Sequence, residues 1–319
     1  MSETPATTSA ARPPTGFEVG ADRTFRALTR TMAWLAIGLV FLIVLRIAWT
    51  AQPAIQAYGL DFLTTSKWDP SGGHFGILPQ ICGTLYSSIL GVALGAAFGI
   101  AVAIFITQDF LPPRLEVVIK NVVELLAAIP SVVNGLWGIF VVIPAIRPVC
   151  NWIHDGLSWV PFFNSPLLSV GMLPAALVLA IMVLPTVTAI SRDALASVPP
   201  KLREAAFGLG ATRWETILAV ILPTASRGIY GSIILAFGRA VGETMALAML
   251  LGNSNTLGWS LFAPGNTLAA LMANQWPEAN TIEKEALMYA GLVLLAITLA
   301  INIIGTIILQ RTVKLEPQR

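Results

Sequence analysis

Six long apolar runs are the feature that most constrains how this chain can fold. They lie near residues 31–50, 81–106, 121–143, 168–190, 226–250 and 287–310. A helix of about 20 residues crosses a hydrocarbon core of about 30 Å, so each run is long enough to span a membrane. Apolar residues make up 55% of the chain and charged residues 11%. Short alternating strands, as in an outer-membrane barrel, are absent, which leaves a helical bundle. The sequence predicts an all-α integral membrane protein with six transmembrane helices.

The basic residues indicate how these helices are oriented. Most of the 19 Lys and Arg residues flank the runs on one side, namely Arg12, Arg23, Arg26, Arg30, Arg114, Lys120, Arg192, Lys201, Arg203, Arg213, Arg227, Arg311, Lys314 and Arg319. The other side has only Lys67, Arg147 and Lys284. Because loops rich in Lys and Arg stay in the cytoplasm, we expect a multi-pass protein with both termini cytoplasmic.

The same pattern divides the chain into segments. Residues 1–22 are rich in Pro, Thr, Ser and Ala and are expected to form a disordered cytoplasmic tail. We do not expect a signal peptide there, because no apolar segment directly follows the first Met. Residues 23–80 should form the first transmembrane helix and an outer loop. We expect a core of five helices over 81–310 and a cytoplasmic tail over 311–319.

The cysteines and histidines offer little for chemistry. Cys82, Cys150, His74 and His154 all fall on the outer side of the predicted topology. A disulfide between the two cysteines is possible, but two unpaired thiols are the simpler interpretation. We expect no metal site and no cofactor, with both histidines as loop residues.

One run carries two opposite charges. The segment "FGRAVGETMALAM", Phe237 to Met249, contains Arg239 and Glu243. On one continuous helix a spacing of four places both side chains on the same face. Arg239 lies about 20 Å beyond Arg227 at about 1.5 Å per residue, near mid-membrane. A lone arginine there costs at least about 2.5 to 3.5 kcal/mol, so it should face the protein interior or a water-filled path. An ion pair that only fixes helix packing is the alternative.

Other polar and small residues also stand out within the runs. Gly91, Gly95 and Gly99 form a smooth stripe that favours close helix packing. Pro130 falls inside the third run, where we expect it to kink the helix. Ser131 and Asn134 follow it and either line a path or hold helices together; the sequence leaves both possibilities open.

The longest loop on the basic side has its own pattern. It reads "SRDALASVPPKLREAAFGLGATRWETILAVILP", residues 191–223. The prolines at 199 and 200 suit the start of a helix, and the glycines at 208 and 210 suit its end. Thr212 and Glu215 have the spacing of a capping box that begins a second helix. We therefore predict a helix, a glycine turn and another helix.

This loop resembles the EAA loop of ABC-importer permeases. That motif is written EAA, three residues, G, nine residues, I, any residue, LP, and its counterparts here are Glu204, Ala205, Ala206, Gly210 and "VILP" ending at Pro223. Val220 stands where the motif has isoleucine. The resemblance implies the type I importer fold (MetI-like), with one added helix before a five-helix core. It also implies that Arg203, Glu204, Ala205, Ala206 and Gly210 couple the permease to a cytoplasmic ATPase.

Four further segments resemble the phosphate-specific permeases of the PstC type. They read "IPSVVNGLWG", "LREAAFGLGATRWETI", "GRAVGETMALAMLLGN" and "SLFAPGNTLAALMAN". Asn134 departs from the expected pattern, which has tyrosine there. The resemblance implies a subunit of an ATP-driven phosphate importer in the bacterial inner membrane, working by alternating access. It also implies that Arg239 and Glu243 lie on the translocation path. We hypothesise that Glu243 neutralises Arg239 while the path is empty and that passing phosphate displaces it.

The resemblance also implies partners. These are a cytoplasmic ATPase dimer, a second permease subunit, an extracytoplasmic phosphate-binding protein and membrane lipid, with no nucleic acid. Outer-loop tryptophans, among them Trp159 and Trp259, suit either the membrane interface or docking of the binding protein.

We expect no enzymatic activity from the chain itself. None of its lysines follows a glycine, so there is no Walker A motif and ATP hydrolysis must come from a partner. Two other functions remain as alternatives: an ABC permease for another oxyanion such as sulfate or molybdate, and an ATP-independent secondary transporter. An intramembrane enzyme is disfavoured because neither histidine lies in a run and no HExxH motif occurs.

Overall fold

The computed structural model describes residues 15–108 and 110–314, with side chains to 310. The helices of its first half are α1 (Gly16–Tyr58), α2 (Asp61–Thr64), α3 (Leu78–Thr107), α4 (Pro113–Ala128), α5 (Ser131–Trp137), the π-helix η1 (Gly138–Val142) and α6 (Ile143–Leu157). Those of the second half are α7 (Met172–Ala196), α8 (Pro200–Gly208), α9 (Arg213–Thr216), the π-helix η2 (Ile217–Ile221), α10 (Leu222–Val241), α11 (Met245–Leu250), α12 (Leu268–Gln275) and α13 (Thr281–Lys314). Strands β1 (Trp68–Asp69) and β2 (His74–Phe75) pair antiparallel.

The described residues contain six helical segments long and apolar enough to cross a membrane, which confirms the predicted number. They are Gly16–Tyr58, Leu78–Thr107, Ser131–Leu157, Met172–Ala196, Arg213–Val241 and Thr281–Gln310. The chain is thus a multi-pass membrane protein. Four segments include the predicted runs almost entirely, but the third and fifth have different bounds.

The third segment begins at the proline that was expected to kink it. Helix α4 ends at Ala128, and Ile129 is extended with ψ 125°. Proline disfavours the helical conformation of the residue before it, so the helix stops here and a new one starts at Ser131. The predicted span 121–143 is therefore wrong in its bounds, since α4 is a separate helix and the candidate span runs to Leu157.

The fifth segment ends earlier than predicted. Helix α10 stops at Val241, and a break at residues 242–244 separates it from the short helix α11. The expectation of one helix over 226–250 is wrong. Its start also lies further upstream, because α9, η2 and α10 follow one another without interruption from Arg213.

The predicted N-terminal tail differs at its end. Residues 1–14 lie outside the described residues, but α1 already begins at Gly16. The backbone N–H of Thr15 donates to Glu18 Oε2 at 2.6 Å, and Glu18 N–H donates to Thr15 Oγ1 at 3.3 Å. This reciprocal capping box explains why the helix starts within the segment expected to be disordered.

The chain divides into two units, residues 1–49 and 50–319. The described part of the first is a single helical segment, the beginning of α1. Its large apolar side chains, such as Trp34 and Phe41, are exposed. A helix that is apolar on all sides is suited to a lipid environment.

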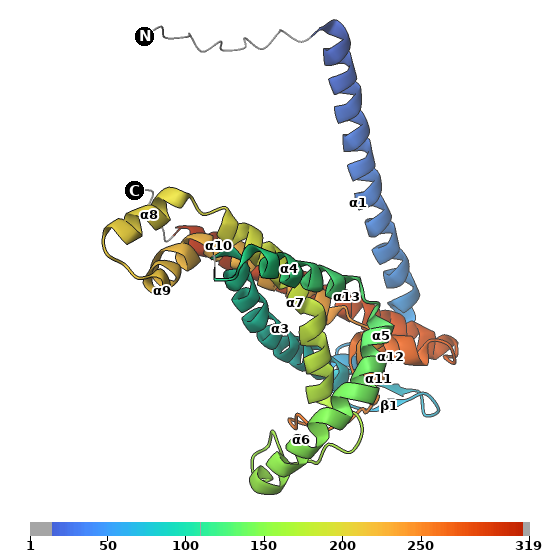
Figure 1. The fold of residues 1–319 in the computed structure, drawn as a ribbon. Coiled ribbons are helices and arrows are strands. Elements are labelled where there is room, and N and C mark those ends of the chain that lie inside the picture. The colour runs from blue at the N-terminus through green and yellow to red at the C-terminus, as the bar shows by residue number, and fades with distance from the viewer. Residues whose placement is uncertain (1–14, 109, 315–319) are drawn as a thin grey trace, which may run out of the picture. The chain divides into compact units, whose positions relative to one another are not determined.

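The second unit is built around α3 and α7, which lie side by side (Figure 1). The glycine stripe makes this approach possible. A Cβ on Gly91 would meet Leu179 side-chain atoms at 2.8 Å, and one on Gly95 would meet Val183 Cγ2 at 2.5 Å. Gly99 faces Val187 in the same way. The prediction that these glycines serve helix packing is confirmed.

Helix α10 packs against α7 on one side and α13 on the other. Figure 1 shows α8 and α9 at one end of this unit and α6 at the other. We call these the α8 end and the α6 end. Near the hairpin formed by β1 and β2, Phe62 of α2 stacks on Tyr289 of α13 with ring centroids 4.4 Å apart. Cys82 is exposed, Cys150 is buried, and both are free thiols.

Candidate functional site

The EAA segment forms an exposed helix at the α8 end. Pro200 opens α8, and Pro199 precedes it as the cap residue. Lys201, Glu204 and Gly208, spaced three to four residues apart, are exposed on one face of the helix. Ala206 points the other way and is buried. The predicted helix therefore exists and presents Glu204 outward.

A glycine turn ends this helix. Gly210 N–H donates to the carbonyl of Phe207 at 2.9 Å, and Ala211 N–H donates to the carbonyl of Ala206 at 3.1 Å. This is the Schellman pattern, whose turn residue adopts a left-handed conformation. Gly210 has φ +84°, which explains why a glycine stands here.

The next helix is capped as predicted. Glu215 N–H donates to Thr212 Oγ1 at 3.3 Å, and Thr212 N–H donates to Glu215 Oε2 at 2.7 Å. Two orphan backbone donors are thereby satisfied at the start of α9. The Schellman turn and the capping box together hold α8 and α9 in a defined hairpin.

Aromatic and cationic side chains attach α9 to the end of α3. The rings of Phe110 and Trp214 lie 5.4 Å apart, and the guanidinium of Arg213 lies 4.9 Å from the Phe110 centroid. Arg203 and Arg213 also line a small hollow of about 60 Å³ beside Gln108. Sequence analysis missed Phe110, whose only signal was an aromatic residue shortly after a span.

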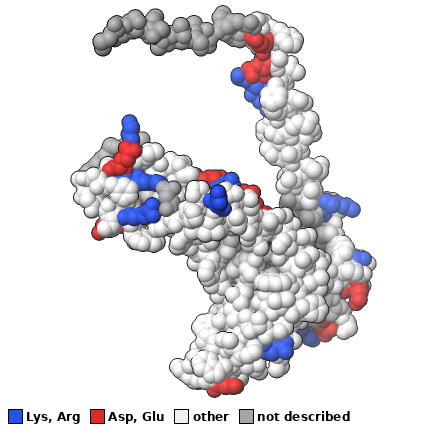
Figure 2. Space-filling view, in the orientation of Figure 1, with Lys and Arg blue, Asp and Glu red and all other residues white. Residues whose placement is uncertain are grey.

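The outer surface of α8 combines charge with apolar groups. Leu202 is 41% exposed, Phe207 45% and Leu209 90%. Charged side chains gather over α8 and α9 in the space-filling view, whereas the middle of the unit is almost free of charge (Figure 2). An exposed helix with apolar side chains and an acidic residue is suited to docking against another protein.

The second predicted group, Ser131 and Asn134, lies on α5 next to α11. A Cβ on Gly135 would meet Met249 Sδ at 2.8 Å and Ala246 Cα at 3.3 Å, and one on Gly138 would meet Leu250 at 2.8 Å. Helix α5 and the start of η1 are thus in close contact with α11. Asn134 is 8% exposed. Ser131 is the first residue of α5 and is half-buried.

Arg239 and Glu243 do not share one helix face. Arg239 is exposed in the last turn of α10, and Glu243 lies in the break before α11. No ion pair joins them in the part of the chain that the structure describes. Instead, Glu243 Oε1 accepts a hydrogen bond of 3.3 Å from Ala246 N–H. The prediction of a paired face is wrong because the helix ends between the two residues.

Glu243, which precedes the cap residue Thr244, therefore bonds to the first turn of α11, while Arg239 is left exposed beside the break. Sequence analysis also missed Asn302, a polar residue in the apolar helix α13. A Cβ on Gly238 would lie 3.5 Å from Asn302 Oδ1. This places an amide next to the residue preceding Arg239. Asn302 is half-buried. Broken helices and polar side chains within membrane spans are found where a protein lines a water-filled path.

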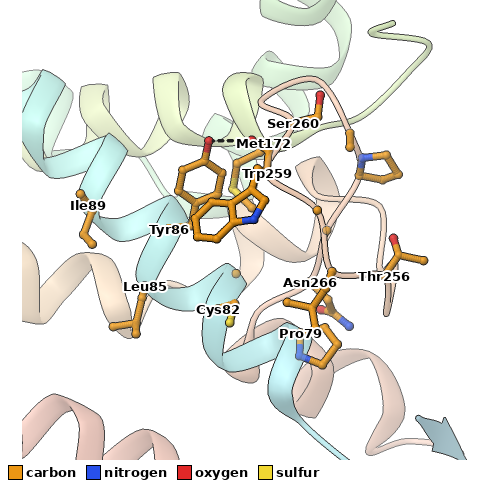
Figure 3. A pocket seen from close by; sticks show the side chains of 16 residues that line it. Pro79, Cys82, Leu85, Tyr86, Ile89, Met172, Thr256, Trp259, Ser260 and Asn266 are labelled. Atoms are coloured by element: carbon orange, nitrogen blue, oxygen red, sulfur yellow. Dashed lines mark hydrogen bonds between the residues drawn. The ribbon is translucent and has the colours of Figure 1, made fainter. Parts of the chain in front are cut away.

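A hollow of about 340 Å³ lies between α3 and the loop before α12 (Figure 3). Tyr86 Oη–H donates to the Trp259 carbonyl at 3.0 Å across its wall. None of its lining residues is charged, and none of the predicted pathway residues belongs to them. This hollow is therefore poorly suited to an anion.

Comparison with known proteins identifies the family. Residues 91–314 match the family described as binding-protein-dependent transport system inner membrane component. The chain belongs to this family. The match covers the hairpin of α8 and α9, the break at 242–244 and all of α13. The resemblance drawn from the EAA motif is thus confirmed for this permease.

Several relatives are similar along almost the whole permease. It is 35% identical over 302 residues to the phosphate transport system permease protein PstC of Xylella fastidiosa, covering 93% of both chains. It is 37% identical over 296 residues to PstC of Mesorhizobium japonicum, covering 91% of this chain and 90% of that protein. It is also 37% identical over 295 residues to PstC of Haemophilus influenzae, covering 90% of this chain and 92% of that protein.

Solved structures confirm the fold. The permease matches a chain of the inward-facing MetNI methionine ABC transporter with a TM-score of 0.55 and 18% identity, covering 74% of this chain and 95% of that one. It matches a chain of a bacterial alginate ABC transporter with a TM-score of 0.60 and 19% identity, covering 88% and 92%. The permease therefore has the MetI-like fold that was predicted.

Proposed function

We propose that this permease is the PstC-type transmembrane subunit of an ATP-driven importer of inorganic phosphate, forming half of a translocation path that works by alternating access. The observation that carries this proposal is the similarity to PstC proteins over at least nine-tenths of the chain. The exposed coupling helix supports it, because a permease with such a helix has a surface on which an ATPase can act.

The α8 end is the proposed docking site of the cytoplasmic ATPase dimer, with both termini cytoplasmic. Glu204 and the apolar side chains of α8 would enter the partner surface. The path of force is short, because α7 leads into α8 and the turn at Gly210 leads into α9. Closure of the ATPases would thus move α7 and α10 together. A second permease subunit would complete the path, and a phosphate-binding protein would dock at the α6 end.

Arg239 is the proposed phosphate contact on the path. Phosphate at neutral pH is an anion with several acceptor oxygens, and guanidinium offers a planar set of donors that matches it. The exposed guanidinium at the break is available for this contact. Ser131 and Asn134 would line the path nearby. Glu243 would stabilise the start of α11 through its hydrogen bond with Ala246 N–H.

The test is uptake of radiolabelled phosphate by phosphate-starved cells that carry the permease and its partners. Arg239→Ala should lower uptake about tenfold or more, since a hydrogen bond to a charged group is worth about 1.5 to 3 kcal/mol. Arg114→Ala is the matched control, because Arg114 is exposed on α4. Membrane levels of all variants are matched by immunoblot.

Two outcomes would count against the proposal. If Arg239→Ala transports normally, the arginine has a structural role only. If excess sulfate or molybdate, but not unlabelled phosphate, competes for uptake, the permease carries another oxyanion. Uptake that persists when ATP is depleted and the membrane potential is kept would instead indicate a secondary transporter.

A further inference from the structure

A cavity of about 190 Å³ lies between α4, α7 and the end of α3. Its walls are largely apolar, with Ile106, Val123 and Pro185 among them. Lys120 and Glu124 line it from α4, and Arg192 lines it from α7. None of the coupling or pathway residues discussed above lines this cavity.

The three charged side chains around the cavity do not form ion pairs with one another among the described residues. Lys120 and Glu124 are one turn apart on α4, yet no ion pair joins them among the described residues. Lysine preceding glutamate by four residues is the less favourable order for such a pair. Arg192 is 25% exposed and donates through Nε and one terminal nitrogen to Asp193 Oδ1, which leaves further guanidinium donors.

One end of the cavity lies near the ends of two helices that are long and apolar enough to cross a membrane, where lipid headgroups are expected. Ile106 and Arg192 are near the ends of the membrane-crossing helices α3 and α7 at the α8 end. Helix α4 is amphipathic, and its apolar side chains Leu115, Val118 and Leu125 are exposed. Such a helix lies along a membrane interface with its apolar face toward the acyl chains. Basic pockets between helices at this level bind lipid headgroups.

We propose that this cavity binds a phospholipid with a phosphoethanolamine headgroup. Lys120 and Arg192 would donate to the phosphodiester oxygens, and the Glu124 carboxylate would accept hydrogen bonds from the primary ammonium. The apolar walls would cover the start of the acyl chains. The presence of both charge signs favours this headgroup. A purely anionic headgroup would be repelled by the Glu124 carboxylate, and a choline headgroup has no N–H that could donate to it. The inference does not rest on the phosphate-import function.

The test is lipid binding to the purified full-length permease in detergent, followed by native mass spectrometry. Phosphatidylethanolamine, phosphatidylcholine and phosphatidylglycerol with identical acyl chains are added in separate titrations. The first should bind about tenfold more tightly than the second, as expected for loss of a charge-assisted hydrogen bond. Inorganic phosphate at millimolar concentration should leave the bound lipid in place.

Variants assign the binding to this cavity. Glu124→Gln should abolish the preference for the ethanolamine lipid over the choline lipid. Lys120→Gln should lower the affinity for both lipids about three- to tenfold. Arg114→Gln removes an exposed cation of α4 outside the cavity and should change neither. Size-exclusion profiles check that each variant is folded.

Three results would overturn the inference. The first is equal affinity for the ethanolamine and choline lipids. The second is an Arg114→Gln effect as large as that of Lys120→Gln, which would indicate unspecific attraction. The third is displacement of the lipid by inorganic phosphate, which would show that the cavity takes the free anion.

Discussion

At the scale of single residues, Glu243 shows how a charge in a membrane span can act on the backbone instead of on another charge. Its carboxylate accepts a hydrogen bond from the first turn of α11. Glutamine can accept the same bond through its amide oxygen, but alanine cannot. We expect Glu243→Ala to lower the free energy of unfolding by about 1 kcal/mol, and Glu243→Gln to lower it by much less. Thermal unfolding of the purified permease measures both.

The outcome distinguishes capping from charge pairing. If the two Glu243 variants are equally destabilised, the negative charge is what matters and the capping role is wrong. Transport by Glu243→Gln then reports separately whether the charge contributes to passage of the anion.

Asp69 gives a pH-dependent prediction at the turn between β1 and β2. Hydrogen bonds from Ser71 Oγ and Gly72 N–H, together with Lys67, lower the pKa of its carboxyl from 3.8 to about 2. A lowered pKa means that this stabilisation is complete above about pH 4 and is lost as the pH falls toward 2. In wild type, amide hydrogen exchange at Gly72, corrected for intrinsic rates, should become slower as the pH rises from about 2 to about 4. In Asp69→Asn the protection should not vary with pH in this range.

At the scale of elements, the hairpin of α8 and α9 depends on one left-handed residue, Gly210. Gly210→Ala places a Cβ at φ +84° and should cost about 1 to 2 kcal/mol. We expect loss of ATPase stimulation by the binding protein, because the hairpin no longer holds α8 in position. Co-purification of the ATPase and its hydrolysis rate measure this effect.

Gly208→Ala is the matched control for the hairpin. Gly208 is helical, and a Cβ there would meet nothing within 4 Å. This variant should behave as wild type, because alanine favours the helix. An equal loss in both variants would show that the surface of α8, and not the turn, is sensitive.

The packing of α3 against α7 is a second property of elements. A Cβ on Gly95 would approach Val183 Cγ2 to 2.5 Å and the Ala180 carbonyl oxygen to 2.7 Å. Because backbone cannot yield easily, Gly95→Ala should destabilise the permease by about 1 to 3 kcal/mol. Gly231→Ala, where a Cβ meets nothing within 4 Å, should be neutral. Thermal unfolding that ranks the two variants equally would contradict this packing.

At the scale of the whole molecule, the proposed orientation can be tested with single cysteines. In a background with Cys82→Ala and Cys150→Ala, Ser71→Cys lies in the turn between β1 and β2, and Ser197→Cys lies between α7 and α8. Both positions are exposed. An impermeant maleimide applied outside the inner membrane should label the first in intact spheroplasts, and the second only after permeabilisation. The reverse pattern would place the termini outside.

Much of the fold follows from local chemistry. The apolar runs predict six spans because a bilayer requires about 20 apolar residues per helix. The hairpin of α8 and α9 was predictable, since proline at a helix start, glycine at its end and the Thr212–Glu215 capping box act within a few residues. The N-terminal capping box at Thr15 is just as local, yet the composition of the tail outweighed it in the prediction.

The sequence by itself determined the number of spans, the hairpin of α8 and α9, and the glycine stripe, because each depends on neighbours within a turn or two of helix. Only the tertiary structure decided that Pro130 ends a helix instead of kinking it, and that Arg239 and Glu243 belong to different elements. Those outcomes depend on whether packing against other helices makes up for lost backbone hydrogen bonds. For α11 it does: Ala246, Leu247 and Leu250 are buried in the core beside α5 and α7, which stabilises a break that helical periodicity alone does not reveal.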